Sequence, residues 1–323
     1  MEFHKNILQI DAEKTVSDLC EVISTQVRSI LKKRGVVVGI SGGIDSSVTA
    51  AVCVKALGQK KVLGVMMPEK ESSRQSKVLA SKLAEKLDIE TVLEDLTGPL
   101  EAMGCYRMRD KAIRQVFPEF GPDWRCKITI PTSILEKGAL NVFSLTIENK
   151  AGEIKSQRMP LDVFLQVVAA SNMKQRLRMS MLYYHAEKRN WAVAGTANKD
   201  EHAQGFFVKY GDGGVDFRPI AHLFKVQIYQ LAEYLQIPRE IILRVPTTDT
   251  YSASVTQKEF FFGLDFLVMD TLWYASENDV PAAKAAQVLG LTVEQAESGY
   301  ANLERKVKAT EYLRMSPLDI KKI

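Results

Sequence analysis

The residues best suited to chemistry lie between residues 36 and 47, which read Val-Val-Val-Gly-Ile-Ser-Gly-Gly-Ile-Asp-Ser-Ser. The valines predict a buried parallel strand, and the glycines after it let the backbone approach a ligand closely. A helix predicted from Val48 to Leu57 would direct free N–H groups and the positive end of its dipole at this turn. A strand, a glycine turn and a helix start in this order predict a phosphate-binding loop.

Asp45 is unexpected in such a loop, because a carboxylate repels phosphate unless a cation lies between them. Its presence predicts Mg²⁺, a cation that proteins hold through one or two carboxylates together with phosphate oxygens. The plainer alternative is a tight turn before a serine-capped helix. No Gly-Lys-Ser/Thr follows, so the segment is not a Walker loop, and the glycine spacing does not fit the dinucleotide fingerprint.

A second polar segment, Ala-Gly-Thr-Ala-Asn-Lys-Asp-Glu at residues 194–201, follows a predicted strand at 191–194. Ligands of open α/β sheets bind beyond the carboxyl ends of the strands. We therefore expect Thr196 and Glu201 near the phosphate loop, with Glu201 as the second carboxylate for Mg²⁺ opposite Asp45. An exposed loop acid is an equally good interpretation of Glu201 from this segment alone.

A third segment, residues 205–216, combines glycines with Lys209, Asp212 and Asp216. This composition suits a mobile loop that closes over a substrate. Downstream, Lys225 opens a predicted helix and could place a point charge on the leaving group of a triphosphate. The alternative for Lys225 is a solvated lysine at a helix start.

The elements that would position these residues follow from the hydrophobic pattern. The N-terminal part alternates strands and helices, which predicts a parallel sheet with right-handed crossovers. Residues 100–160 are predicted to be an insertion that contains a β-hairpin with its turn at 149–152. The predicted strands are 36–38, 61–67, 90–93, 127–130, 143–147, 153–158 and 191–194, and the predicted helices are 11–33, 48–57, 76–87, part of 98–116, 161–189, 225–235, 260–274, 282–289 and 292–313.

The composition indicates a soluble enzyme. The 323 residues are 46% hydrophobic and 25% charged, and a net charge of +4 is too mild to predict nucleic-acid binding. No apolar run is long enough to span a membrane, and the first residues lack a signal-peptide pattern. The four cysteines are widely spaced without a C-x-x-C pair, which argues against a disulfide framework or a zinc knuckle. We expect a cytoplasmic protein.

The Ser-Gly-Gly-x-Asp-Ser motif resembles the pyrophosphate loop of the N-type ATP pyrophosphatases, which adenylate a substrate and release pyrophosphate. Together with the other segments, in the same order, it makes the chain similar to the NAD synthetase family. That family amidates nicotinic acid adenine dinucleotide (deamido-NAD). The similar segments are 39–47, 66–68, 172–179, 195–201, 209–214, 219–225 and 246–247.

The resemblance implies a Rossmann-like open parallel α/β sheet with helices on both faces, of the adenine nucleotide alpha hydrolase-like type. It implies one domain over 1–280, with a helical C-terminal extension over 281–323. It also implies a reaction through an acyl-adenylate with Asp45, Lys225 and Asp212 as catalytic residues. The implied ATP-binding residues are Gly39, Ser41, Gly42, Gly43, Asp45, Ser46, Ser47, Met67, Thr196, Lys225 and Thr247; those for deamido-NAD are Asn172, Arg176, Lys209, Asp212 and Asp216; and Asp45 and Glu201 would bind Mg²⁺.

The implied partners are ATP, deamido-NAD and ammonia, with a homodimer built partly on the helix that contains Arg176 and Tyr183. No nucleophilic cysteine or nitrilase-like segment is expected before the core, so ammonia would come free or from a separate glutaminase. Two residues depart from the family pattern, which usually has threonine at Val208 and an acid at Lys258. These departures leave open a related amidoligase for a different carboxylate. A tRNA-modifying ligase and a non-catalytic nucleotide-binding module are the remoter alternatives.

Overall fold

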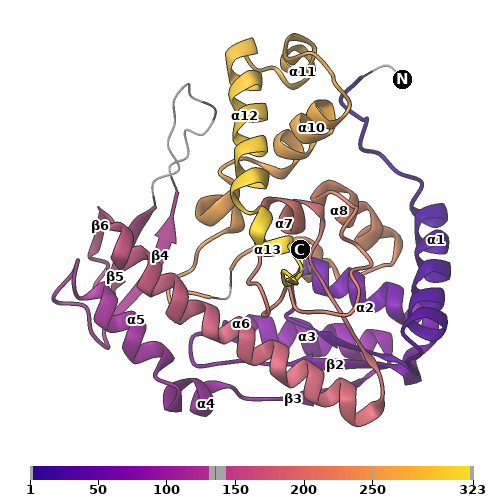
Figure 1. Cartoon of the computed structure of the whole chain (residues 1–323), viewed down its shortest axis with the longest axis horizontal. Helices are drawn as coiled ribbons and strands as arrows, with labels where there is room; N and C mark the ends of the chain where they lie inside the picture. Colours follow the sequence, from indigo (N-terminus) through magenta and orange to yellow (C-terminus); the bar gives the residue numbers. More distant parts are fainter. Residues whose placement is uncertain (1–2, 131–134, 136–142, 249, 321–323) are drawn as a thin grey trace.

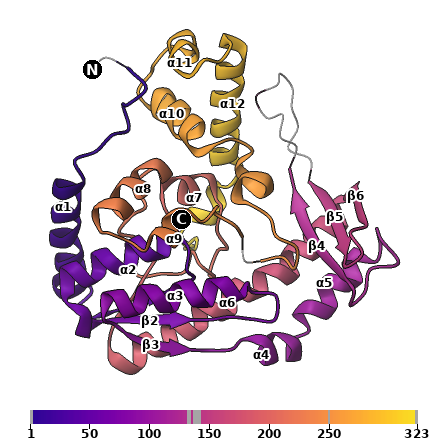
Figure 2. The same cartoon turned by 180° about the vertical axis from the view of Figure 1, so that it is seen from behind.

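The computed structural model describes residues 3–130, 135, 143–248 and 250–320, and a four-stranded parallel sheet lies at its centre (Figure 1, Figure 2). The strand order is β3-β2-β1-β7, and the register sets Val37 opposite Leu63 and Val193. The predicted open parallel sheet is therefore confirmed, and the carboxyl ends of all its strands meet at one edge. The strands are β1 (Val36–Gly39), β2 (Val62–Met66), β3 (Glu90–Leu93) and β7 (Ala192–Ala194).

Helices cover both faces of this sheet. Figure 1 and Figure 2 show α2 (Ile44–Leu57) and α3 (Arg74–Leu87) on one face and the long helix α6 (Leu161–Arg189) on the other. Val36 and Val38 belong to the core that includes α2, together with α1 (Ala12–Thr25) and α8 (Lys225–Tyr234), whereas Val37 belongs to a core on the α6 side. A strand that is buried on both faces needs an apolar residue at each position, which explains the valine run.

The helix after the phosphate loop begins earlier than predicted, at Ile44 instead of Val48. Gly43 is its extended N-cap residue, and the hydroxyls of Ser46 and Ser47 donate to the Gly43 carbonyl oxygen at 2.9 and 2.8 Å. These serines stabilise the first turn instead of preceding it. Asp45 consequently lies inside the first turn of α2, beside the loop's free N–H groups.

The segment between β3 and α6 is more than the predicted hairpin. It contains α4 (Thr97–Ala102), α5 (Cys105–Ile113) and an antiparallel sheet of β4 (Trp124–Thr129), β5 (Ser144–Asn149) and β6 (Ile154–Arg158). The predicted hairpin corresponds to β5 and β6, and β4 pairs with the other edge of β5. Ile128 and Ile147 of this sheet share a core with Val163 and Val167 of α6. The insertion is therefore fixed to the helix that covers the central sheet.

The C-terminal third is helical, as predicted, but two predicted helices are interrupted. The helix expected over 260–274 is a π-helical turn, η3 (Lys258–Phe262), followed by α10 (Phe266–Glu277), because Gly263 adopts a left-handed conformation with φ +75°. The helix expected over 292–313 divides at Thr310 into α12 (Val293–Ala309) and α13 (Glu311–Arg314). Shorter elements are α7 (Lys199–Gln204), α9 (Arg239–Ile242), α11 (Ala282–Leu289), η1 (Gln26–Ile30) and η2 (Gln59–Lys61).

The helices α10, α11 and α12 share one core, which includes Trp273, Ala285 and Leu303 and also Phe224 at the start of α8. The boundary predicted at residue 280 stays a prediction, since the apolar packing continues across it. Within the described part of the chain, no helix is both long enough and apolar enough to span a lipid bilayer.

Candidate active site

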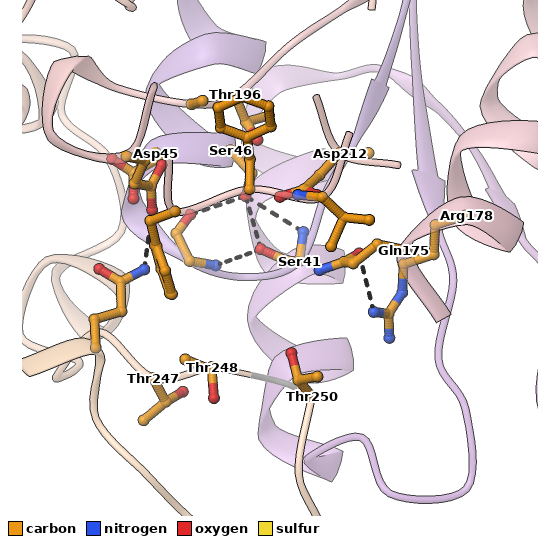
Figure 3. Close-up of a pocket in the computed structure, with 18 of the residues that line it drawn as sticks. Ser41, Asp45, Ser46, Gln175, Arg178, Thr196, Asp212, Thr247, Thr248 and Thr250 are labelled. Carbon is orange, nitrogen blue, oxygen red and sulfur yellow. Dashed lines mark hydrogen bonds between the residues drawn. The ribbon is translucent and has the colours of Figure 1, made fainter. Parts of the chain in front are cut away.

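One cavity of about 750 Å³ lies beyond the carboxyl ends of β1, β2 and β7. The phosphate loop lines one part of it, and the middle of α6 and the 205–212 loop line another (Figure 3). Residues from late in the chain complete the wall, and these include Ile241, residues 244–248, Thr250, Tyr251, Tyr312 and Leu313. The three sequence segments predicted to act together are therefore in a single cavity. The predicted residues that line it are Gly39, Ser41, Gly43, Asp45, Ser46, Met67, Asn172, Arg176, Thr196, Glu201, Lys209, Asp212 and Thr247.

The phosphate loop is shaped by Gly42 and by a network of serine hydroxyls. Gly42 has φ +74°, and a Cβ at this position would lie 2.5 Å from the Ser76 carbonyl oxygen, so only glycine fits. The Ser41 and Ser46 hydroxyl oxygens are 3.2 Å apart, and the Gly43 N–H donates to Ser41 Oγ at 3.2 Å. This network holds the loop open towards the cavity, whereas Ser47 is fully buried behind it.

Asp45 lies at the centre of a charged cluster. Lys225 Nζ contacts its Oδ2, and Asn198 Nδ2 donates to its Oδ1 at 2.8 Å. Lys225 is fully buried, so it is not the solvated lysine of the alternative interpretation. Burial lowers the pKa of Lys225, but the carboxylates of Asp45 and Glu201 outweigh this effect and hold the pKa above its ordinary value. Lys225 is therefore a permanent cation behind the phosphate loop.

Glu201 is the second acid of the cluster. It belongs to α7, where the Asn198 side chain accepts the Glu201 backbone N–H and the Glu201 side chain accepts the Asn198 backbone N–H. Gln257 Nε2 donates to Glu201 Oε1 at 3.0 Å. Burial, and then the nearby charge of Asp45, raises the pKa of Glu201 to about 8. An added cation would relieve this repulsion.

The donor set fits Mg²⁺ that arrives with phosphate. Among the described residues there is no group of three or more His, Cys, Asp and Glu side chains able to hold a metal ion. Mg²⁺ usually takes only one or two protein carboxylates, with phosphate oxygens and water as its remaining ligands. Asp45 and Glu201 could supply those two carboxylates, because both line the cavity beside the serines of the loop.

The 205–212 loop carries the polar residues on the other side of the cavity. Asp212 Oδ1 accepts the backbone N–H of Val208 at 2.8 Å, and burial raises the pKa of Asp212 to about 6. Lys209 Nζ donates to the carbonyl oxygens of Tyr312 and Met315 at 2.8 and 3.0 Å. Val208 also lines the cavity, so its departure from threonine places an apolar side chain there.

The structure places some predicted residues behind the cavity wall. Asp216 accepts the Tyr183 hydroxyl at 3.1 Å and the Val193 N–H at 2.7 Å, so it holds β7 to α6. Gly42, Ser47 and Lys225 support the phosphate loop from behind. Lys258 pairs with Asp265 at 2.9 Å, and both side chains are exposed. The departure at Lys258 therefore points away from the residues that line the cavity.

Sequence reasoning missed several polar residues of the site. Asn198 had a visible signal, because Asn-x-x-Glu before a helix is a capping-box pattern. Gln257, by contrast, reaches Glu201 only through the fold. Arg244 donates to Ser76 Oγ at 2.9 Å beside the phosphate loop. Gln175, Arg178, Thr248 and Thr250 also line the cavity, and Figure 3 shows them with Thr247, which was predicted.

The family model and the curated relatives that match this chain carry the same family name. The family model for NAD synthase matches residues 15–119 and 128–317. The NH(3)-dependent NAD(+) synthetase of Mesorhizobium japonicum is 45% identical over 97% of this chain and 98% of its own length. The protein of the same name from Thermotoga maritima is 34% identical over 74% of this chain and 79% of its own length.

Solved structures share the fold. The NH3-dependent NAD synthetase of Campylobacter jejuni superposes with a TM-score of 0.63 at 24% identity, covering 97% of this chain and all of that one. The NMN synthetase of Francisella tularensis superposes with a TM-score of 0.61 at 21% identity, and the match covers 96% of this chain and 99% of that one. The two structures share an architecture at identities too low to transfer residue roles. The residues matched by the family model include most of the insertion, without 120–127, and all of the C-terminal helices.

Proposed function

The chain belongs to the NAD synthase family, and from that membership we propose that its cavity converts deamido-NAD to NAD. The reaction uses ammonia as the nitrogen donor, free or from a separate glutaminase, and splits ATP into AMP and pyrophosphate. One observation carries the proposal. A phosphate loop with a buried acid–lysine pair, Asp45 and Lys225, opens into the same cavity as the polar loop that contains Lys209 and Asp212.

ATP would bind at the phosphate loop. The Ser41 and Ser46 hydroxyls and the N–H groups at the start of α2 suit its phosphates, because a helix N-terminus attracts anions. Met67 and Thr196 would contact the nucleoside, and Thr247 would lie near the phosphates. Asp45 and Glu201 would hold Mg²⁺, which neutralises phosphate charge when it is bound. Lys225 adds a fixed positive charge that stabilises the departing pyrophosphate.

Deamido-NAD would occupy the side of the cavity formed by α6 and the 205–212 loop. Asn172 and Arg176 project from α6, and Lys209 supplies a cation for an anionic group of the dinucleotide. The nicotinate carboxylate would then face the α-phosphate of ATP. Holding the two reactants in this orientation supplies much of the rate enhancement, since neither step needs a protein nucleophile.

The chemistry follows in two steps. A carboxylate oxygen of deamido-NAD attacks the α-phosphorus, the bond to the bridging oxygen breaks, and pyrophosphate leaves. Ammonia then attacks the carbonyl carbon of the acyl-adenylate, and AMP leaves with the bond electrons. Ammonium must lose a proton before it can attack. Asp212, whose pKa is raised to about 6, is a suitable acceptor because it is ionised at neutral pH yet partly matched to the proton.

We propose a homodimer built on the solvent-facing side of α6. Its exposed residues include Leu161 and Leu165 near the start, Arg176 and Ser180 in the middle, and Tyr184 near the end. Leu161, Leu165 and Tyr184 are 71%, 55% and 53% exposed. Burial against a second copy would remove these exposed apolar groups from water.

The direct test measures pyrophosphate release from ATP, Mg²⁺ and ammonium, with and without deamido-NAD, while NAD is followed by mass spectrometry. We expect release to require deamido-NAD and to match NAD formation mole for mole. Release with a different carboxylate, and none with deamido-NAD, would mean that the cavity serves another acid. ATP binding without any turnover would contradict the enzymatic function.

A further inference from the structure

The C-terminal strap, defined here as residues 310–315, is fixed to the polar side of the cavity. Thr310 Oγ1 donates to the Gln204 carbonyl oxygen at 3.0 Å, and Arg314 Nη1 donates to that of Ala203 at 2.7 Å. Gly205 has φ +78°, and a Cβ there would lie 2.3 Å from Thr310 Cβ. Figure 1 and Figure 2 show the strap crossing the middle of the molecule near α7. These contacts hold it against the start of the 205–212 loop.

The strap also forms hydrogen bonds with Lys209, a residue that lines the cavity. Two backbone carbonyls of the strap, those of Tyr312 and Met315, accept from Lys209 Nζ. An ammonium group carries three hydrogens, so one remains to face a ligand. Lys209 lines the cavity together with Tyr312 and Leu313 of the strap. The structure describes no acid paired with Lys209, whose Nζ lies 5.6 and 5.9 Å from the ring centroids of Tyr210 and Tyr312, so no carboxylate balances its charge.

We propose that the strap positions Lys209 for the anionic substrate, which makes Arg314 and Thr310 positioning residues for deamido-NAD. This inference rests on the proposed function. A free lysine side chain is flexible and loses conformational entropy when it binds an anion. Two carbonyl groups fix Lys209 beforehand without neutralising it, because a carbonyl is a dipole and not a charge. The strap therefore acts on the binding of the dinucleotide and not on that of ATP.

The experiment is a double-mutant cycle between Arg314 and Lys209 in the full-length protein, with KM and kcat measured for each substrate. We expect Arg314→Ala to raise the KM for deamido-NAD about fivefold, and Lys209→Ala to raise it about tenfold or more, as for loss of a charge-assisted hydrogen bond. In the double variant the KM should equal that of Lys209→Ala alone. The KM for ATP and the melting temperature should change little in all three.

Arg305→Ala is the matched control, since Arg305 is exposed on the neighbouring helix α12 and has no described side-chain partner. Should Arg314→Ala not fold, Thr310→Val removes one anchor in nearly the same volume, and Thr310→Ser restores it. Additive effects in the cycle, an unchanged KM, or a lower KM from a strap variant would each overturn the proposal. Wild-type turnover of deamido-NAD tests the proposed function separately, so failure of either inference can be distinguished.

Discussion

Lys225 is a proposed site residue that does not line the cavity. Its side chain is fully buried behind Asp45, which places a fixed positive charge at the phosphate loop. Local pattern alone predicted Asp45 and the serines, because phosphate binding and helix capping act over a few residues. It could not distinguish Lys225 from a surface lysine, and it assigned Asp216 to the substrate although Asp216 holds β7. Only the fold decides which acids and lysines face inward.

Replacing Lys225 with methionine tests its role in the chemical step. We expect kcat to fall about 100- to 1,000-fold, as when one preorganised electrostatic group is removed from an active site. The KM for deamido-NAD should change less than kcat. Lys258→Met is the control, because that lysine pairs at the surface with Asp265. Equal kcat values for the two variants would remove Lys225 from the mechanism.

The burial of Lys306 predicts an unusual dependence of the free energy of unfolding on pH. Its Nζ donates to the Phe261 carbonyl oxygen at 2.7 Å, and burial lowers the pKa of Lys306 to about 7. Between pH 7 and 10 the unfolded chain binds more protons at this site than the folded chain. The free energy of unfolding should therefore gain up to about 1.4 kcal/mol per pH unit from this residue as pH rises, and lose it as pH falls towards 7.

Urea unfolding at pH 7, 8 and 9 measures this contribution. The stability of Lys306→Met relative to wild type should fall steadily from pH 7 to pH 9, because the variant lacks the titrating group. Lys308→Met, at an exposed position of the same helix, should follow wild type. Parallel curves for wild type and Lys306→Met would show that this lysine titrates normally.

At the scale of elements, α6 is joined to the cavity by a buried ionic network. Lys174 Nζ donates to Glu69 and Glu71 at 2.9 and 2.7 Å and to the Thr250 carbonyl oxygen at 3.0 Å. Arg109 of α5 pairs with Glu71 as well. The network joins the insertion, the loop after β2 and the backbone at Thr250. Through Arg109, the insertion is therefore linked to α6 and to the backbone at Thr250, and both of these contribute to the cavity wall.

Lys174→Met tests this network. Removing one partner leaves buried carboxylates without compensation, so we expect a loss of about 3–5 kcal/mol in the free energy of unfolding. Lys188→Met, near the solvent-exposed end of the same helix, should cost less than about 1 kcal/mol. Chemical denaturation of both variants at one pH is sufficient. A similar small loss for both would mean that the network contributes little to stability.

Sequence patterns located most elements but not their interruptions. The ends of α6, α11 and β3 agree with prediction, because each is set by local periodicity and clear end signals. The strand β4 begins three residues earlier than predicted. The predicted helix 260–274 is interrupted at Gly263, after η3, and the predicted helix 292–313 is interrupted at Thr310, after α12. The pairing of β4 with β5 depends on tertiary contacts that periodicity does not encode.

At the scale of the whole molecule, the exposed apolar residues of α6 lead us to expect association. Leu161→Glu combined with Leu165→Glu would place charges inside the proposed interface, so we expect a dimer to become a monomer in sedimentation experiments. Val78→Glu is the matched control, because Val78 is 64% exposed on α3, across the sheet from α6. A monomeric wild type, or a double variant that stays dimeric, would place any interface elsewhere.

The walls of the cavity come from residues as far apart in the sequence as Gly39 and Leu313. A ribosome adds about 5–20 residues per second, so the phosphate loop is synthesised roughly tens of seconds before the strap. The nascent chain carries its ATP loop throughout this period without Lys209 fixed beside it. Because the last wall is made only near the end of synthesis, a prematurely terminated chain should lack a complete dinucleotide site. Such a chain would keep the loop proposed for ATP but could not position deamido-NAD, so we expect it to make no NAD.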